Sequence, residues 1–425
     1  MSPKDNATTS GAGDVLAVGF GTTVAMWALG YLTRLPVVSA PPAIVLVLLL
    51  AALVYGGFVA GRRGARGVSR GAYGGALTGL LNLLVLGSFL SSQDRPNAVV
   101  PSALLWFPGS IAFSSLLGAA GAWWGRRRPQ PPNTAADWTA ALAKVAVCAT
   151  FLLLVAGGLV TSNKAGLAVV DWPRSYGYNM FLYPFSRMTG GIYYEHAHRL
   201  LGALVGLTTV TLAIHLTLVE TRTFVKRLAW LAVVLVIGQG ILGGLRVTER
   251  NLYLAVVHGV TAQIFFSLLV AIAVVVTRTW RGDHKPAASA STASERRIAS
   301  IAVVALIVQI ALGAIQRHLA LGLMLHIVSA FVVASLTIAA GVRAWGLHPD
   351  DPVLKRAGLT VVHATGTQLA LGFCAWIARE AWTTGSMSAE WKVVLTTMHQ
   401  GTGALLLASA VALRLWLSRR LTPGE

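Results

Sequence analysis

Four histidines in otherwise apolar segments are the residues best suited to chemistry in this sequence: His198, His258, His326 and His399. The residue four positions further on is always glycine or alanine: Gly202, Ala262, Ala330 and Gly403. Because residues i and i+4 lie one above the other on a helix face, each imidazole has almost no side chain beside it. This arrangement favours a flat, wide ligand.

Imidazoles on facing helices can hold haem iron from both sides of the porphyrin. A single membrane histidine can equally be a packing residue, and small residues are also common where helices approach closely. Four equivalent positions argue against that alternative. Zinc is disfavoured because structural zinc sites need four nitrogen or sulfur ligands, and the only cysteines, Cys148 and Cys374, lie apart in apolar segments. We therefore predict that all four histidines bind haem iron.

Glu195 lies three residues before His198, which places a carboxylate on the ligand face of the same helix. The structural alternative is an i,i+4 ion pair with Arg199. The functional interpretation is a catalytic group that acts as a general base or stabilises developing positive charge. The corresponding positions before the other histidines are not acidic: Ala255, Leu323 and Thr396. Only the first site is therefore expected to be catalytic.

The composition indicates that membrane-spanning helices position these residues. The chain has 425 residues, of which 55% are hydrophobic and 12% charged, with a mean hydropathy of +0.67. Soluble domains carry about 25% charged residues, so a water-soluble enzyme is excluded. Twelve windows have the roughly 20 apolar residues that a spanning helix needs. We predict an all-α polytopic membrane protein with spans starting near Asp14, Ala43, Gly71, Pro101, Thr139, Gly191, Val225, Asn251, Arg297, Leu319, Gly358 and Trp391.

The formal net charge of +19 reflects membrane orientation rather than nucleic-acid binding. Alternate loops hold 18 Lys and Arg in one set and 10 in the other. Since cytoplasmic loops are enriched in Lys and Arg, both termini are predicted to be cytoplasmic. The lipid bilayer is a predicted partner and nucleic acid is not.

Two composition shifts and a repeat predict the domain organisation. Gly125–Asp137 is basic and Pro-rich, and separates a four-span region, residues 1–130, from a block of eight spans, residues 131–425. Gly282–Ser294 is Ala/Ser-rich and divides that block into four-helix bundles at 138–281 and 296–420. A Gln-x-x-Leu-Gly pattern precedes three of the histidines, at Gln239–Gly243, Gln309–Gly313 and Gln368–Gly372. The histidine-bearing helix recurs four times, and the Gln-x-x-Leu-Gly pattern precedes three of these helices. The block is therefore predicted to contain four copies of one hairpin in two pseudo-symmetric bundles.

The segment between Thr161 and Gly190, called the outer loop below, is predicted to cover the first site. About 30 residues without an evident helix exceed the usual connection length, which is typical of a lid or binding loop.

Over residues 138–417 the sequence resembles the haem A synthase family, particularly its prokaryotic branch. The motifs that carry the resemblance are Gly157-Gly158-Leu159-Val160-Thr161, the stretch from Gly166-Leu167 to Asp171-Trp172-Pro173, Glu195-x-x-His198-Arg199, and the histidines His258, His326 and His399. Some members carry a cysteine pair in the outer loop, whereas this loop has none.

The resemblance implies an oxidoreductase that converts the C8 methyl of haem O to the formyl of haem A for terminal oxidase assembly. It implies that His198 and His258 bracket the substrate haem, that His326 and His399 bracket a haem b cofactor, and that Glu195 is catalytic. It further implies a multi-pass protein of the prokaryotic plasma (inner) membrane, with haem O synthase and terminal oxidase assembly factors as partners and an electron donor that is not identified.

Two other functions are consistent with parts of the sequence. A dihaem b-type membrane cytochrome that only transfers electrons would use the same histidines, with Glu195 structural. A transporter with a histidine proton relay is less consistent, because the hairpins all run in one direction and no broken midplane helices are evident. Arg246, Arg317 and Arg379 at predicted outer helix ends could pair with haem propionates, but such arginines are more often solvated. The four N-terminal spans lie outside the family pattern.

Overall fold

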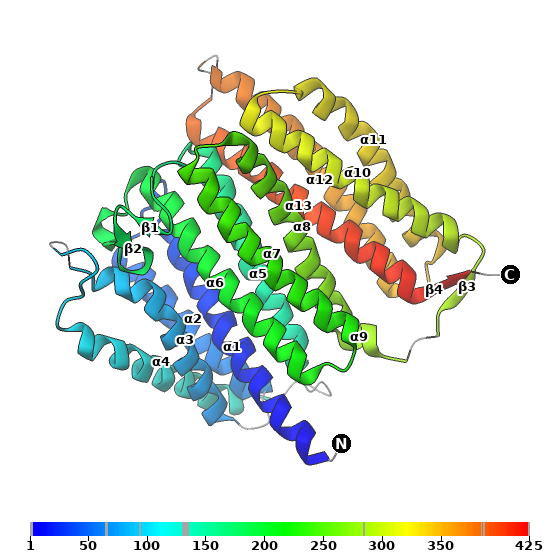
Figure 1. Ribbon diagram of the computed structural model, residues 1–425. Coiled ribbons are helices and arrows are strands. Elements are labelled where there is room, and N and C mark those ends of the chain that lie inside the picture. Colours follow the sequence, from blue (N-terminus) through cyan, green and yellow to red (C-terminus); the bar gives the residue numbers. More distant parts are fainter. Residues whose placement is uncertain are drawn as a thin grey trace. The chain divides into compact units, whose positions relative to one another are not determined.

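A computed structural model describes residues 3–63, 67–92, 95–129, 136–283, 285–383, 385 and 387–423. In these residues, thirteen α-helices dominate, and twelve are long and apolar enough to cross a membrane (Figure 1). The two sheets are short, with two strands each. The prediction of an all-α polytopic membrane protein with twelve spans is confirmed.

The long helices are α1 Pro3–Thr33, α2 Pro42–Arg63, α3 Val68–Phe89, α4 Ala103–Arg126, α5 Trp138–Ser162, α6 Gly190–Val219, α7 Thr223–Thr248, α8 Leu252–Val275, α10 Thr292–Leu319, α11 Leu323–Leu347, α12 Pro352–Thr383 and α13 Ala389–Arg420. The expected start at Leu319 is wrong, because α10 extends to that residue. Ala320 and Gly322 then adopt left-handed φ angles of 56° and 74°, which end one helix before the next begins.

The chain forms two compact units, and each is described by itself. One comprises the described residues up to Ala156 and Lys164–Val234, and the other comprises Gly157–Asn163 and the residues from Leu235 onward. The predicted domain boundary near residue 130 falls at residues 130–135, outside those that the structure describes. The predicted division into domains and bundles therefore stays a prediction.

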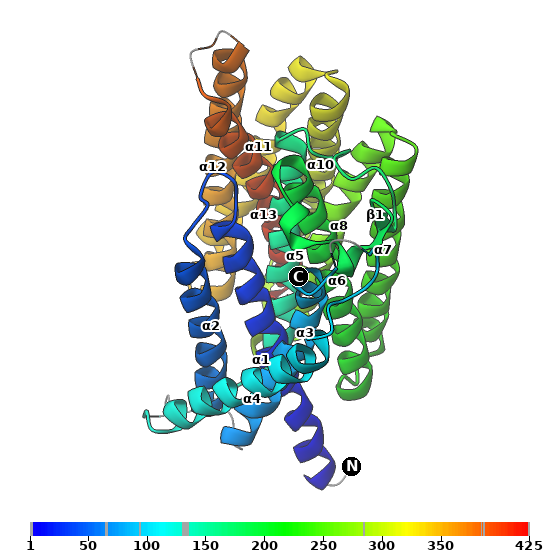
Figure 2. The ribbon, with the colours of Figure 1, turned by 90° about the vertical axis from the view of Figure 1, so that its left-hand side faces the viewer.

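In the first unit, α2, α3 and α4 pack through glycines, and α4 runs across the other two helices (Figure 2). A Cβ atom on Gly57 would lie 2.1 Å from the Gly118 carbonyl oxygen, and one on Gly118 would lie 2.3 Å from the Gly71 oxygen. A Cβ on Gly75 would likewise lie 2.2 Å from the Ser114 carbonyl oxygen. These backbones touch directly, which requires residues without side chains.

In the second unit, α13 packs against α8, α10 and α12, and α10 also contacts α8 and α11. Fully buried leucines of α13, such as Leu413 and Leu417, lie in its core. The Ala/Ser-rich segment near Ser289 is ordered: β3 Ala287–Ser289 pairs in parallel with β4 Leu421–Pro423. The short helix α9 Arg278–Arg281 precedes it.

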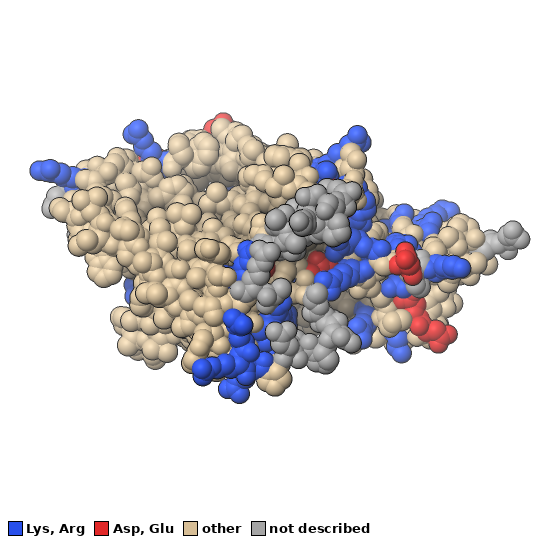
Figure 3. Space-filling model, turned by 90° about the horizontal axis from the view of Figure 1, so that it is seen from below, with Lys and Arg blue, Asp and Glu red and all other residues tan. Residues whose placement is uncertain are grey.

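Basic side chains mark the ends of several spans. Arg62 and Arg63 end α2, Arg126 ends α4, and Arg419 and Arg420 end α13. The face drawn in Figure 3 carries many more Lys and Arg than acidic side chains. Which side of the membrane this face occupies stays a prediction.

Candidate haem site

Glu195 and Arg199 lie side by side in the N-terminal part of α6. Glu195 is 3% exposed, and Arg199 Nη2 donates to its Oε1 at 2.9 Å. The second carboxylate oxygen, Oε2, accepts the backbone N–H of Val169 at 2.9 Å. The ion pair that was the structural alternative for Glu195 is therefore present, and both oxygens of the carboxylate are engaged.

Arg199 also fastens the outer loop to α6. Its guanidinium donates to the carbonyl oxygens of Asp171, Arg174 and Val169 at distances of 2.7, 2.9 and 2.9 Å. A planar guanidinium presents several donors in a fixed geometry, so one side chain can hold three loop carbonyls and a carboxylate. The position of Glu195 is consequently coupled to the fold of the loop.

The outer loop is folded rather than merely extended. Strands β1 Arg174–Ser175 and β2 Tyr178–Asn179 form a hairpin, followed by the 3-10 turns η1 Met180–Leu182 and η2 Phe185–Arg187. The two turn residues, Tyr176 and Gly177, have φ angles of 52° and 79°, as a type I′ turn requires. Both turn N–H groups donate to the Asp171 carboxylate, at 2.6 and 2.8 Å.

His196 contributes to this loop and not to the predicted ligand set. Its ring is fully buried, with Nδ1 3.1 Å from the Ser175 hydroxyl and the ring centroid 5.0 Å from that of Tyr183. Burial raises the pKa of the Tyr183 phenol, which stays neutral. His196 therefore packs against residues of the outer loop.

His198, on the same helix, is half-buried. Gly202 and Gly206 follow it at intervals of four residues, and no heavy atom of the described residues outside the local helix lies within 4 Å of a Cβ built on either one. The small residue beside this imidazole therefore borders open space. His198 belongs to the first unit and His258 to the second, so their predicted pairing stays a prediction.

In the second unit, each Gln-x-x-Leu-Gly glycine lies against the histidine of the next helix. A Cβ on Gly243 would lie 3.3 Å from Cε1 of His258. The corresponding distances are 3.0 Å for Gly313 and His326, and 2.9 Å for Gly372 and His399. The repeat seen in the sequence is thus a repeated three-dimensional contact, in which a missing side chain makes room for an imidazole.

The glutamines of the repeat lie beside the same histidines. The Gln309 amide nitrogen is 3.1 Å from Nδ1 of His326 and donates to its carbonyl oxygen at 2.8 Å. The Gln368 amide nitrogen lies 3.5 Å from Nε2 of His399. Gln239 donates instead to the Thr261 hydroxyl, one turn from His258, at 2.6 Å. Sequence reasoning found these glutamines only as markers of the repeat, and their positions require the folded hairpins.

His326 and His399 are brought together within the second unit. Their ring centroids are 6.4 Å apart and their planes are nearly perpendicular, at 85°. In the described residues, no group of three or more His, Cys, Asp or Glu side chains is arranged to hold a metal ion by itself. The pair therefore offers two imidazoles but, among the residues that the structure describes, no complete metal site by itself.

Arg317 is an arginine that sequence reasoning left off the list of site residues. It is half-buried, and it donates to the Gly158 carbonyl oxygen at 3.1 Å and to the Ser162 hydroxyl at 2.6 Å. Ser162 also lies 3.1 and 3.0 Å from the hydroxyls of Thr396 and Thr397. Arg317 is therefore bonded within the protein rather than simply solvated, and nothing in its sequence position distinguishes it from the other outer arginines.

Residues 140–327, from α5 to the start of α11, match the cytochrome oxidase assembly protein family, COX15-CtaA. This segment is similar to that family. The resemblance to haem A synthases that the sequence indicated is confirmed over these residues. No curated protein matches the chain.

The COX15-CtaA segment contains Glu195, His198, His258 and His326, whereas His399 lies beyond its end. His399 nevertheless makes the same contact with a motif glycine as the two histidines before it. The four N-terminal spans also lie outside the matched segment.

Proposed function

We propose that this protein is a haem A synthase-like membrane oxidoreductase, which converts the C8 methyl of haem O to the formyl of haem A for assembly of a terminal oxidase. The family match over residues 140–327, with Glu195, His198, His258 and His326 inside it, carries this proposal. The proposed location is the prokaryotic plasma membrane, with both termini cytoplasmic.

The protein's own residues support a haem b site at His326 and His399. The ring centroids of these two histidines lie 6.4 Å apart within one unit, so both side chains would be able to hold one haem b. His399 Nδ1 is buried and has no hydrogen-bond partner among the described residues, which leaves it available as a ligand. A bound haem b would supply electron transfer.

His198 and His258 are the proposed ligands of the substrate haem O. Open space beside Gly202 and Gly206 supports a flat ligand next to His198. His258 Nδ1 is also buried without a hydrogen-bond partner in the described part of the chain. These two histidines would hold and orient the substrate haem.

Glu195 is the proposed catalytic carboxylate. Its Oε1 is held by Arg199 and its Oε2 by the Val169 N–H, so the charge is compensated in an apolar setting where an isolated carboxylate would be unstable. A carboxylate fixed in this way can accept a proton or stabilise developing positive charge at the substrate edge. The outer loop above it would limit access of water.

The engaged carboxylate also supports a second candidate, a dihaem cytochrome that only transfers electrons. In that case the Glu195–Arg199 pair would serve to anchor the outer loop and nothing more. The two functions share all four histidine ligands and differ only in the role of Glu195.

The deciding experiment is to extract haems from purified protein co-expressed with a haem O source and to identify them by mass. We expect haem A or its hydroxylated precursor from wild type and at least a tenfold loss in Glu195→Gln, with haem b content unchanged, because the neutral isostere keeps the shape but lacks the charge.

Arg199→Gln is the matched control, because it removes the same ion pair and keeps the carboxylate. A loss of product in Glu195→Gln well beyond that in Arg199→Gln would support a catalytic carboxylate. Equal losses, accompanied by equal loosening of the outer loop, would make Glu195 structural. Haem b alone from every protein would favour the cytochrome.

A further inference from the structure

We propose that the four N-terminal helices are a positioning element that holds the outer loop over the Glu195 end of α6. This inference rests on the proposed function for its consequence in catalysis, but its structural part can be tested without activity. The region lies outside the family match, yet within the first unit it contacts the family segment at the outer loop and at α6.

The first contact is between the end of α3 and the two 3-10 turns of the loop. The rings of Phe89 and Phe185 stack with centroids 4.1 Å apart, and the Arg34 guanidinium lies 5.1 Å from the Phe185 ring centroid. Ser88 donates its hydroxyl to the Phe181 carbonyl oxygen at 3.2 Å. A Cβ on Gly87 would lie only 2.6 Å from that same oxygen, so this glycine permits the close approach.

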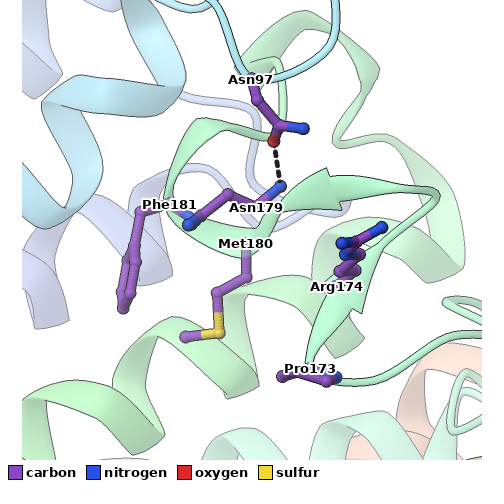
Figure 4. Close-up of a pocket in the computed structure, with 6 residues that line it drawn as sticks. All are labelled: Asn97, Pro173, Arg174, Asn179, Met180 and Phe181. Carbon is purple, nitrogen blue, oxygen red and sulfur yellow. Dashed lines mark hydrogen bonds between the residues drawn. The ribbon is translucent and has the colours of Figure 1, made fainter.

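The second contact comes from the turn between α3 and α4. Asn97 has a left-handed φ of 65°, which asparagine tolerates well, and its side-chain oxygen accepts the backbone N–H of Asn179 at 2.5 Å (Figure 4). Asn179 in turn caps η1 by accepting the Phe181 N–H at 3.0 Å. Asn97, Asn179 and Phe181 also line a pocket of about 400 Å³ together with Pro173, Arg174 and Met180.

The third contact joins α1 to α6 directly. Tyr31 and Tyr193 stack almost in parallel, with ring centroids 5.7 Å apart and planes 6° apart, and Tyr193 donates its hydroxyl to the Tyr31 carbonyl oxygen at 2.7 Å. Both rings are buried. Tyr193 precedes Glu195 by two residues, so the N-terminal region also fixes the helix segment that carries the carboxylate.

These contacts continue to Glu195 through the loop. Arg199 holds the carbonyl oxygens of Asp171 and Arg174, and the Val169 N–H donates to Glu195 itself. The loop is therefore held on one side by α6 and on the other by the N-terminal helices. It contains no cysteine, so no disulfide can fasten it, and non-covalent contacts must do so.

The test uses the full-length chain and two variants, Asn97→Gly and Phe89→Ala. Asn97 is an exposed turn residue with a positive φ, so glycine removes the side chain without straining the backbone and the protein is expected to fold. Phe113→Ala is the matched control, because Phe113 is an exposed phenylalanine of α4 and takes part in none of the loop contacts described above.

The first readout is amide hydrogen exchange of loop residues 165–187 and tryptic cleavage at Arg174 and Arg187. We expect cleavage at least fivefold faster in Asn97→Gly and Phe89→Ala, with the control at the wild-type rate. Cleavage and exchange at wild-type rates in both variants would overturn the proposal, whatever the protein does with haem.

The second readout is the haem A formed per bound haem b. We expect it to fall at least threefold in the two variants while haem b content stays constant, because the loop no longer holds Glu195 in place. A loosened loop with unchanged product formation would overturn the positioning role in catalysis. Absence of product in wild type would refute the proposed function, while the first readout would still decide whether the helices hold the loop.

Discussion

Glycines serve different purposes in the N-terminal helices and in the histidine repeats. In the first region, Gly57 and Gly118 bring one backbone against another, and a Cβ on Gly57 would fall 2.1 Å from a carbonyl oxygen. In the second, Gly313 and Gly372 each face an imidazole edge, at 3.0 and 2.9 Å. The first packing leaves no space between helices, whereas the second reserves space for a ring that can bind a ligand. The same residue type thus produces close backbone packing in one place and, in the other, room for an imidazole that is a proposed haem ligand.

The largest effect is expected in the scaffold. Gly118→Ala places a methyl group 2.3 Å from the Gly71 carbonyl oxygen, and backbone cannot move aside as a side chain can. We expect a loss of about 2 kcal/mol or more in stability, measured as a lower midpoint of thermal unfolding in detergent.

Gly109→Ala in the same helix is the control, because no described heavy atom outside the local helix lies within 4 Å of that position. Equal unfolding midpoints for the two variants would show that the close packing of α3 and α4 does not stabilise the protein, and the contrast between the two regions would fail.

A more selective effect is expected in the repeats. Gly372→Ala places a methyl group 2.9 Å from His399 Cε1, and the imidazole must shift to accommodate it. We expect roughly tenfold weaker haem binding at this site with little loss of stability, measured as the haem-to-protein ratio during titration.

The comparison variant is Gly366→Ala, which lies on the same helix with no described heavy atom outside the local helix within 4 Å. If Gly372→Ala lowered the unfolding midpoint as strongly as Gly118→Ala and left haem binding intact, the repeat glycines would be scaffold residues as well.

The smallest effect is expected at a position that belongs to neither kind of packing. Glu220 follows α6 and accepts hydrogen bonds from the Arg222 guanidinium at 3.0 and 2.7 Å, which lowers the pKa of its carboxyl from 4.5 to about 2. A carboxyl whose folded-state pKa is lowered stabilises the fold above its unfolded pKa, and loses that contribution as the pH falls toward the folded value.

Glu220→Gln should therefore lower stability by up to about 1 kcal/mol at pH 7, and the difference from wild type should shrink between pH 4.5 and about 2. Thermal unfolding across this pH range measures it. If the stability difference between Glu220→Gln and wild type stayed constant with pH, the ion pair between Glu220 and Arg222 would contribute nothing to stability through its charge.

Much of the architecture followed from the sequence. The twelve spans were predictable because a bilayer selects long apolar segments, a property of composition and length alone. The exception near Leu319 is instructive, since Ala320 and Gly322 end α10 by backbone conformation rather than by polarity. The Gln-x-x-Leu-Gly repeat was also visible, because its residues recur at fixed spacing.

The sequence by itself thus determined the spans, the repeated histidines and the acidic residue before the first of them, since each is encoded by residues close together in the chain. Only the tertiary structure decided that the motif glycines face the imidazoles, that Arg199 holds Glu195 and the outer loop, and that Phe89 and Asn97 contact that loop. These contacts join segments that are distant in sequence, and local residue preferences carry no information about which distant partner a side chain meets.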